Sequence, residues 1–509
     1  MYKKLIIQRF LKTSLTTVAV LSITATEAQI SLTGQLRPRL EIRDGFANLT
    51  PESVSPASFV SQRTRLNFGY KWDKVNFGIT LQDVRVWGQD ASTISSADGN
   101  KLMLHEGWAE LILANKTDTT QKFKTLDFLS FKIGRQELVY DDARLIGNLD
   151  WLQQGRRFDM ALIKALHQGW QIELAYAYNQ NAENFSGTAY TPGNIPATVK
   201  TDRGVLVPTP AGIVPLISAN GNSSAAGNPY YANAANTNAG NQNYKNFISF
   251  YVSRKINQSK LSFLAFKDNF SKYRPVSVAV DADNDGTTDG TVYGRAFDLK
   301  GTNDRYTLGG MLNSAIGRVA IQAAYYHQLG EDRDGKDLNA FHTSILASYT
   351  KGKISFGPGF DILSGNKTIT ATSDSKRFDP LYGTPHKFWG YMDYFYAPTG
   401  SPAAGLKDYY FKTKFTTSRY FVTADLHRFD SYHSLAGSVK KHLAHELDLA
   451  LNYSLNKFTN VELGYSAMMA TSALAQAKSQ DISIVYDKSP SFGYLMLNIR
   501  PDFLLKPRG

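Results

Sequence analysis

The chain contains many segments of about ten residues in which apolar and polar side chains alternate. In residues 445–453, every second position from Leu447 to Tyr453 is apolar, and polar or small residues lie between them. Residues 36–43 repeat the pattern with arginines and a glutamate on the polar side. Side chains of a strand point to opposite faces with a period of two, so these segments suit a wall between lipid and water. The pattern predicts an all-β fold, a single transmembrane antiparallel β-barrel.

The candidate strands are joined by connections that alternate between short and long. The short ones lie at 72–73, 168–169, 256–257, 315–316, 352, 416–417 and 456–457, with 114–126 as a longer member of the set. The long ones are 45–56, 87–101, 140–154, 181–243, 269–303, 329–339, 365–405, 429–443 and 468–490. Outer-membrane barrels have short periplasmic turns and long extracellular loops. The rhythm predicts about 18 strands (16 to 20), with both termini on the periplasmic side.

The first 28 residues have the pattern of a secretory signal. A basic segment, 3–12, precedes a short apolar core, 15–23, and small residues stand at 26 and 28. The alternative is a membrane anchor, which needs about 20 apolar residues. We expect residues 1–28 to be a signal peptide and 29–509 to form the barrel in the bacterial outer membrane. Aromatic residues make up 12% of the chain, which suits interfacial girdles, although a large extracellular β-sandwich shares some of this composition.

The chain is basic and has no cysteine, with a formal net charge of +12. The absence of cysteine excludes thiol catalysis and cysteine-ligated metal sites. A basic excess suits nucleic acid, anionic lipid headgroups or an acidic substrate. The bases are spread through the strands rather than gathered in a tail, so we expect contact with outer-membrane lipid and an anionic solute, and no nucleic acid.

Seven segments occur in order along nearly the whole predicted mature chain: 36–43, 62–66, 133–138, 144–159, 378–383, 386–395 and 445–448. They resemble the alginate export family of outer-membrane channels, and 144–159 is the most specific of them. The resemblance implies a monomeric barrel of about 18 strands whose arginine-lined pore conducts an acidic polysaccharide outward. Because members of the family differ in substrate, it implies a channel more than it implies alginate. Periplasmic export partners are a further expectation.

Charges that face an aqueous lumen decide which ions it selects, and a ring of arginines selects anions. Strand parity places Arg37, Arg39 and Arg43 on one face and Arg63 and Arg65 on the equivalent face of the next strand. Further pore-lining or substrate-contacting candidates are Arg85, Arg135, Arg144, Arg156 and Arg157, with the carboxylates Glu41 and Asp159. The alternation slips near residues 82–83, which suggests a β-bulge. The alternative is that such carboxylates pair with the arginines in a structural ladder.

Three of the long loops carry specific expectations. The charge mix of 141–151 predicts that this loop folds inward and narrows the pore, with an ordinary surface loop as the alternative. The 181–243 loop, rich in Asn, Ala, Gly and Pro, predicts a flexible outer loop or one that folds into the mouth. Residues 472–478 predict a short helix.

The run from Asp281 to Asp289 has the spacing D-x-D-x-D-G-x-x-D. It offers Asp281, Asp283, Asp285 and Asp289 around a tight turn, and Ca²⁺ prefers such hard oxygen ligands. The glutamate of a full EF-hand is absent, because Val292 stands at its position. The sequence therefore predicts a structural Ca²⁺ in an extracellular loop, with no cofactor required for function. An exposed acidic turn is the alternative.

Motifs for catalysis are weak. The chain has no H-E-x-x-H and no G-x-S-x-G. His427 with Asp425 and Asp430 is the enzymatic alternative, resembling a protease or lipase arrangement. A lone histidine near an interface is far more often structural, so we expect no enzyme. The leading interpretation is an export channel for an acidic polysaccharide. The alternatives are a general or small-anion-selective porin, or an adhesion scaffold that acts through the 181–243 loop.

Overall fold

The computed structural model describes most of the chain after residue 28. The described residues are 29–88, 102–118, 125–179, 182–184, 187–189, 192–193, 195–218, 220–232, 243–367, 374–396, 402–435 and 441–504. The predicted signal peptide, residues 1–28, lies outside them.

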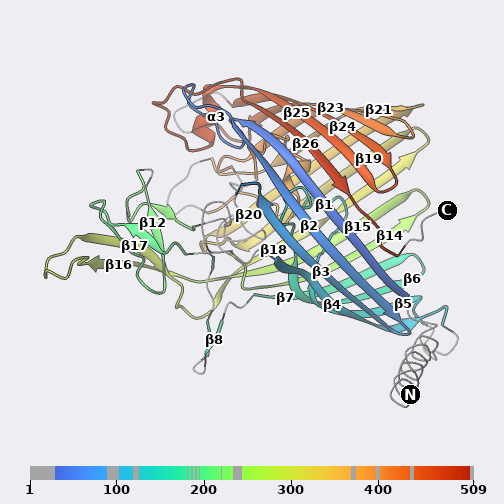
Figure 1. The fold of residues 1–509 in the computed structure, drawn as a ribbon, viewed down its shortest axis with the longest axis horizontal. Coiled ribbons are helices and arrows are strands. Elements are labelled where there is room, and N and C mark those ends of the chain that lie inside the picture. The colour runs from blue at the N-terminus through green and yellow to red at the C-terminus, as the bar shows by residue number, and fades with distance from the viewer. Residues whose placement is uncertain are drawn as a thin grey trace, which may run out of the picture.

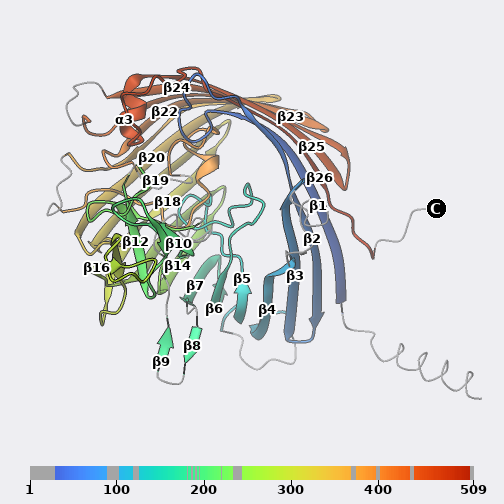
Figure 2. The ribbon, with the colours of Figure 1, turned by 60° about the vertical axis from the view of Figure 1, so that its left-hand side comes forward.

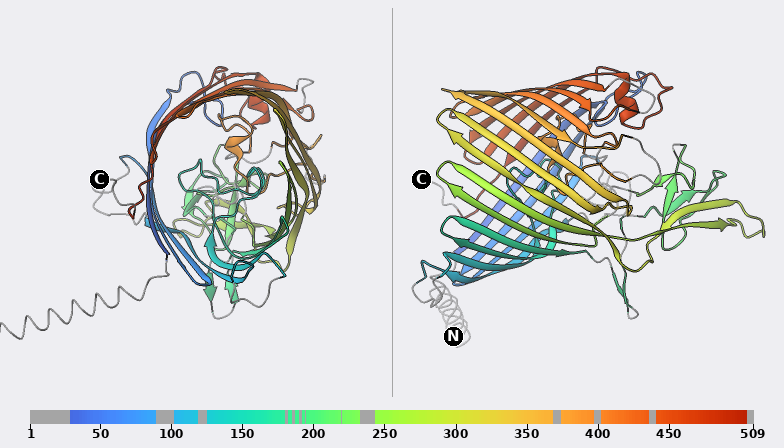
Figure 3. Two further views of the ribbon diagram at one scale, coloured as in Figure 1. Left: turned by 90° about the vertical axis from the view of Figure 1, so that its right-hand side faces the viewer. Right: turned by 180° about the vertical axis from the view of Figure 1, so that it is seen from behind.

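Eighteen strands form one closed antiparallel sheet, which confirms the predicted barrel (Figures 1 and 3). Its strands are β1 (Gln29–Asp44), β2 (Ala57–Trp72), β3 (Val75–Val86), β4 (Leu102–Asn115), β5 (Phe128–Gln136), β6 (Phe158–His167), β7 (Trp170–Tyr178), β14 (Asn246–Ile256), β15 (Ser259–Ser271), β18 (Thr302–Ile316), β19 (Val319–Glu331), β20 (Asp337–Lys351), β21 (Ile354–Leu363), β22 (Leu406–Thr416), β23 (Tyr420–Ser431), β24 (His442–Asn456), β25 (Thr459–Ala470) and β26 (Ser491–Ile499). Each strand pairs with the next barrel strand along the chain, and β26 returns to pair with β1.

Period-two alternation explains the wall. On β1, Leu36, Leu40 and Ile42 are exposed on the outer face, whereas Arg37 and Arg39 are buried on the inner one. The apolar side chains therefore face lipid and the charged ones face the interior of the barrel.

Tight turns connect the strands at one end of the barrel. Four of these turns contain a residue whose φ is positive, between 48° and 60°. These residues are Asp73, Asn257, Gly317 and Gly352. Two-residue hairpin turns require such values, which match the right-handed twist of the flanking strands.

The join between the two ends of the sheet is interrupted. β1 and β26 pair from Arg39↔Met496 onward and again at Leu36↔Ile499, but not at the two positions between. One of these positions is Pro38, which has no N–H to donate.

Two long loops fold into the barrel. We call residues 137–157 the first inner loop and residues 374–396 the second inner loop; the latter includes the short helix η1 (Pro385–Lys387). Figure 3, left, shows both within the ring of strands. Their apolar side chains, with Tyr382 and Trp389 almost fully buried, join inward-facing aromatics of the wall in the main apolar cluster. The predicted inward fold of 141–151 is thus confirmed.

Two other long loops build an ordered outer module beyond the end of the barrel (Figures 1 and 2). Its strands are β10 (Thr198–Lys200), β11 (Leu206–Pro208), β12 (Ile213–Ile217), β13 (Asn228–Pro229), β16 (Arg274–Val280) and β17 (Gly290–Ala296). β12 pairs with both β13 and β17, so backbone pairing joins the 181–243 loop to the 269–303 loop. A small apolar cluster that includes Val199, Val207 and Val292 supports it. The described part of 181–243 therefore contains short paired strands that tie it to another loop, which the expectation of a flexible outer loop did not foresee. A separate short hairpin joins β8 (Ala182–Asn184) to β9 (Gly187–Ala189).

The predicted helix at 472–478 is confirmed as α3 (Ser472–Ala477). No helix among the described residues is both long and apolar enough to span a bilayer.

Candidate functional site

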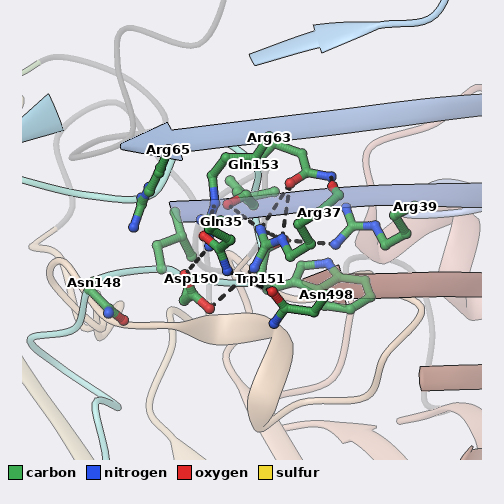
Figure 4. Close-up of polar contacts among 12 residues, drawn as sticks. Gln35, Arg37, Arg39, Arg63, Arg65, Asn148, Asp150, Trp151, Gln153 and Asn498 are labelled. Atoms are coloured by element: carbon green, nitrogen blue, oxygen red, sulfur yellow. Dashed lines mark hydrogen bonds and ion pairs between the residues drawn. The ribbon is translucent and has the colours of Figure 1, made fainter. Parts of the chain in front are cut away.

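Two arginines of neighbouring strands meet on the inner wall under the first inner loop (Figure 4). Arg37 of β1 lies directly opposite Arg63 of β2 in the strand register. Like charges in this position repel each other. Asp150 of the loop bridges them, with Oδ2 3.2 Å from Arg37 Nη1 and Oδ1 2.7 Å from Arg63 Nη2. Gln153 accepts a further hydrogen bond from Arg37 Nε at 3.1 Å.

The two arginines keep Asp150 ionised. Burial alone would raise the pKa of Asp150, but the charges of Arg63 and Arg37 and the hydrogen bond from Arg63 outweigh burial and lower the pKa to about 2. The loop therefore carries a permanent negative charge to the wall at neutral pH.

Arg65 extends the cluster along β2. Its Nη1 lies 3.5 Å from Glu137 Oε1, at the start of the first inner loop. His105 Nε2 lies 2.9 Å from both Arg65 Nη2 and Glu137 Oε1, so it accepts from the first or donates to the second. Burial raises the pKa of Glu137, but hydrogen bonds from His105 and Asn148 and the charge of Arg65 reverse the shift and lower it.

Arg39 and Arg43 form a ladder with a wall carboxylate, as the alternative interpretation predicts. Glu41, on the same strand and almost fully buried, accepts from Arg39 Nε at 2.8 Å and from Arg43 Nη2 at 2.6 Å. Arg39 also donates to the carbonyl of Trp151 at 2.7 Å and stacks on its ring at 3.9 Å. These arginines face inward, but they are committed to structural partners.

Arg144 and Arg156 fasten the inner loops instead of lining the wall. Arg144 forms ion pairs with Asp142 and with Asp361 of β21. Burial lowers its pKa, but these two carboxylates outweigh burial and raise it. Arg156 donates to carbonyls of the second inner loop, at Tyr382 and Gly383.

Three predicted pore residues point outward, so their assignment to the pore is wrong. Arg85 is exposed on the β3 face that carries Phe77, and it pairs with Asp83 at 2.6 Å. Arg135 and Asp159 pair at 2.8 Å on the lipid-side face of β5 and β6. The predicted slip near residues 82–83 is wrong, because β3 keeps its alternation to its end. A register shift beside Thr80 and Leu81 adds a residue to the neighbouring strand β4 instead.

Arg157 lies where the first inner loop rejoins the wall. Its Nη2 is 3.5 Å from the sulfur of Met103 on β4. The structure does not bring Arg157 to the Arg37–Arg63 pair.

The second inner loop has a charged anchor that sequence reasoning missed. Arg305 of β18 is almost fully buried and binds Asp268 of β15, with Nη2 2.5 Å from Oδ2, and Asp379 of the loop at 2.8 Å. Tyr382 donates to the same Asp268 at 2.7 Å. The parity signal was present, but it was obscured because Phe266 and Phe270 share the inward face of β15.

The histidine of the enzymatic alternative has another partner. His427 Nδ1 lies 2.9 Å from Asp408 of β22, rather than from Asp425 or Asp430. Asp425 pairs with Lys412 at 2.7 Å, and Asp430 lies 2.9 Å from His442. The arrangement of the enzymatic alternative is therefore not formed, since neighbouring strands supply the contacts of His427.

Three of the four predicted calcium ligands converge at the tip of the β16–β17 hairpin. Asp281, Asp283 and Asp285 each offer a carboxylate oxygen within 4.8 Å of the others. Asp289 is not part of this group, and its Oδ2 accepts the backbone N–H of Ala282 at 2.7 Å. The Ca²⁺ site stays a prediction for this exposed turn.

Comparison with known proteins supports the family resemblance. Residues 28–179 match the family model for alginate export. This range contains four of the seven segments that carry the resemblance, which is thereby confirmed over this part of the chain. No curated protein matches the sequence.

Solved structures from Pseudomonas aeruginosa share the fold. OccK9 (OpdG) is 13% identical, with a TM-score of 0.52 over 93% of this chain and 99% of that one. The outer membrane protein OpdK is 10% identical, with a TM-score of 0.52 and the same coverage, and so is a structure of OpdK with vanillate. The fold and the family match place the chain in the bacterial outer membrane, as a β-barrel of the kind that forms channels.

Proposed function

We propose that the barrel is an anion-selective channel and that the arginine cluster of β1 and β2 selects the charge of its solute. The observation that carries this proposal is the pair Arg37 and Arg63, set side by side on the inner wall with Arg65 next along β2. Guanidinium groups bind carboxylates in a fixed, directional geometry, and a cationic lining favours anions.

For the solute we propose an acidic polysaccharide that moves outward. Two facts support this choice: the alginate export match over residues 28–179, and the carboxylate that already occupies the arginine pair. A uronate chain offers the same group on every sugar, so successive units can exchange at one site.

A narrower channel for small anions is the second candidate. The inner loops are held by buried ion pairs such as Arg305–Asp379 and Arg144–Asp361, which favour a restricted lumen. One carboxylate fills the arginine pair, and OpdK, which has the same fold, has been solved with vanillate.

Planar bilayers test both candidates. Under a KCl gradient the reversal potential should show anion preference, and Arg63→Gln should shift it towards cations. Arg135→Gln is the matched control, since that arginine pairs with an aspartate on the outer face. Preferential block by uronate oligosaccharides over neutral ones of equal length supports the polysaccharide, and block by small carboxylates alone supports the second candidate. An Arg63→Gln channel with unchanged selectivity contradicts both.

A further inference from the structure

The arginines of β1 have two kinds of carboxylate partner. Arg39 and Arg43 bind Glu41, which belongs to the same strand and is 1% exposed. Arg37 and Arg63 bind Asp150, which belongs to a loop and whose side chain is 47% exposed. The first partner is part of the wall, whereas the second is delivered from the lumen side.

The two buried positive charges of Arg37 and Arg63 require a neighbouring anion, which either the protein or a solute can supply. The two side chains are 3% and 1% exposed and face each other across one register position, so their charges are poorly screened by water. Among the described residues, their other side-chain partners are the neutral amides of Gln153 and Gln35. Without Asp150, another carboxylate would be drawn to the same place.

The site also has an unused donor. Arg63 Nη1 is buried and has no hydrogen-bond partner among the described residues. Asp150 accepts a hydrogen bond from Nη2 of the same guanidinium but none from Nη1. A free carboxylate that approaches both nitrogens can make the bidentate contact that the tethered one does not make.

Residues on either side of Asp150 are fastened independently of it. The ring of Trp151 stacks on His386 at 3.9 Å, and Gln153 donates to the Ser61 hydroxyl at 3.0 Å. On the other side, the backbone N–H of Leu149 donates to the Thr384 hydroxyl of the second inner loop at 3.3 Å. Asp150 can therefore leave the arginines by a local movement while the rest of the loop stays in place.

We propose that Asp150 is a tethered competitor: it occupies the carboxylate subsite of the Arg37–Arg63 pair and is displaced when a carboxylate of the solute binds there. The inference rests on the proposed function and adds a residue that sets how tightly the solute is held. The competitor weakens binding of each unit, so a polyanion is recognised without being trapped. No covalent step is involved.

The first test compares Asp150→Asn with Asp159→Asn in planar bilayers. Asp159 is the matched control, because it lies on β6 just after the same loop and pairs with Arg135 at 2.8 Å on the outer face. A uronate oligosaccharide should block Asp150→Asn at about tenfold lower concentration than the parent, since a charge-assisted competitor has been removed. Asp159→Asn should behave as the parent does. Equal or weaker block of Asp150→Asn overturns the proposal.

A second variant separates charge from any disturbance of the loop. The chain has no cysteine, so Asp150→Cys can be modified at one position within the same bilayer. An anionic methanethiosulfonate should restore the weak block of the parent, whereas a neutral one of similar size should not. Identical block after both reagents counts against the proposal.

The polysaccharide assignment can fail separately. If uronates block neither the parent nor any variant, the polysaccharide assignment is wrong. The role of Asp150 is then tested by the reversal potential under a KCl gradient, which measures selectivity for chloride. A shift of the Asp150→Asn reversal potential towards anions supports an anion subsite under Asp150, and an unchanged potential refutes it.

Discussion

The inner loops and the outer module come from the same end of the barrel but are stabilised differently. The inner loops place aromatic side chains against the wall and bind it through buried charges, as Arg305 does with Asp379. The outer module packs on its own small apolar cluster, and its ion pair Arg274–Asp298 is 53% exposed on both sides. A loop whose apolar residues need the wall becomes part of the lumen, whereas a loop that packs on itself can be removed without affecting the lumen.

Deleting an inner loop and deleting part of the outer module should have the most different effects on conductance. Replacing residues 140–154 with a short glycine-rich turn removes the segment that crosses the lumen, so we expect single-channel conductance to rise severalfold. Replacing the β16–β17 hairpin, 274–296, should leave conductance unchanged. Equal effects of the two deletions would remove the distinction between the loops.

Single ion pairs should show the same contrast in stability. Arg305→Met leaves Asp268 and Asp379 without their buried partner, and breaking such a pair destabilises a protein by about 3–5 kcal/mol. Arg274→Met breaks an exposed pair and should give no measurable change. Urea unfolding of the barrel in lipid vesicles measures both. A midpoint for Arg305→Met that equals that of the parent would contradict the assignment.

Acid should act on the inner loop through Asp150. Its folded-state pKa, about 2, lies below the ordinary value of 3.8, because Arg63 and Arg37 outweigh burial. A group with a lowered pKa stabilises the fold above its unfolded pKa and loses that contribution as pH falls through the folded value. Conductance should therefore hold from about pH 7 to about pH 4 and change only as pH approaches about 2. Asp150→Asn should lack the part of this transition that belongs to the loop, and an identical acid profile would contradict the assignment.

Calcium should have the smallest effect on the channel. We propose that Asp281, Asp283 and Asp285 bind Ca²⁺ at the hairpin tip, and that the ion protects the tip from proteolysis. Conductance should stay the same with Ca²⁺ or chelator, because the tip belongs to the outer module. Asp283→Asn should abolish the protection, and Asp334→Asn, in another exposed acidic turn, is the control. Protection that persists in Asp283→Asn would exclude the site.

Alternation and loop length were enough to predict the barrel, its 18 strands and the inward arginines of β1 and β2. They succeed because lipid on one side and water on the other impose a period of two along every strand. Arg85 and Arg135 were misplaced because they occupy outward positions near the ends of their strands, where each pairs with an aspartate. Charged residues cost little on the outer face near a membrane interface, so their charge alone did not reveal the face.

The second inner loop and the outer module could not be predicted in the same way. The aromatic run 388–396 in one and the valine-rich strand β16 in the other are both apolar, and neither sequence says what it packs against. The contacts that decide this, such as Met392 N–H to Glu446 and β12 to β17, join residues far apart along the chain. The pairing of the barrel strands brings them together.

The interrupted join at Pro38 has a mechanical consequence. A cylinder under stress parts along its weakest line. Pro358 interrupts the pairing of β20 with β21 in the same way, but eight positions pair there, whereas the first strand and the last pair at seven. Thermal or lateral force should unzip the wall there before it separates any other neighbours. A truncated product that ends before β26 would leave β1 as a bare margin, ready to recruit a strand from another molecule.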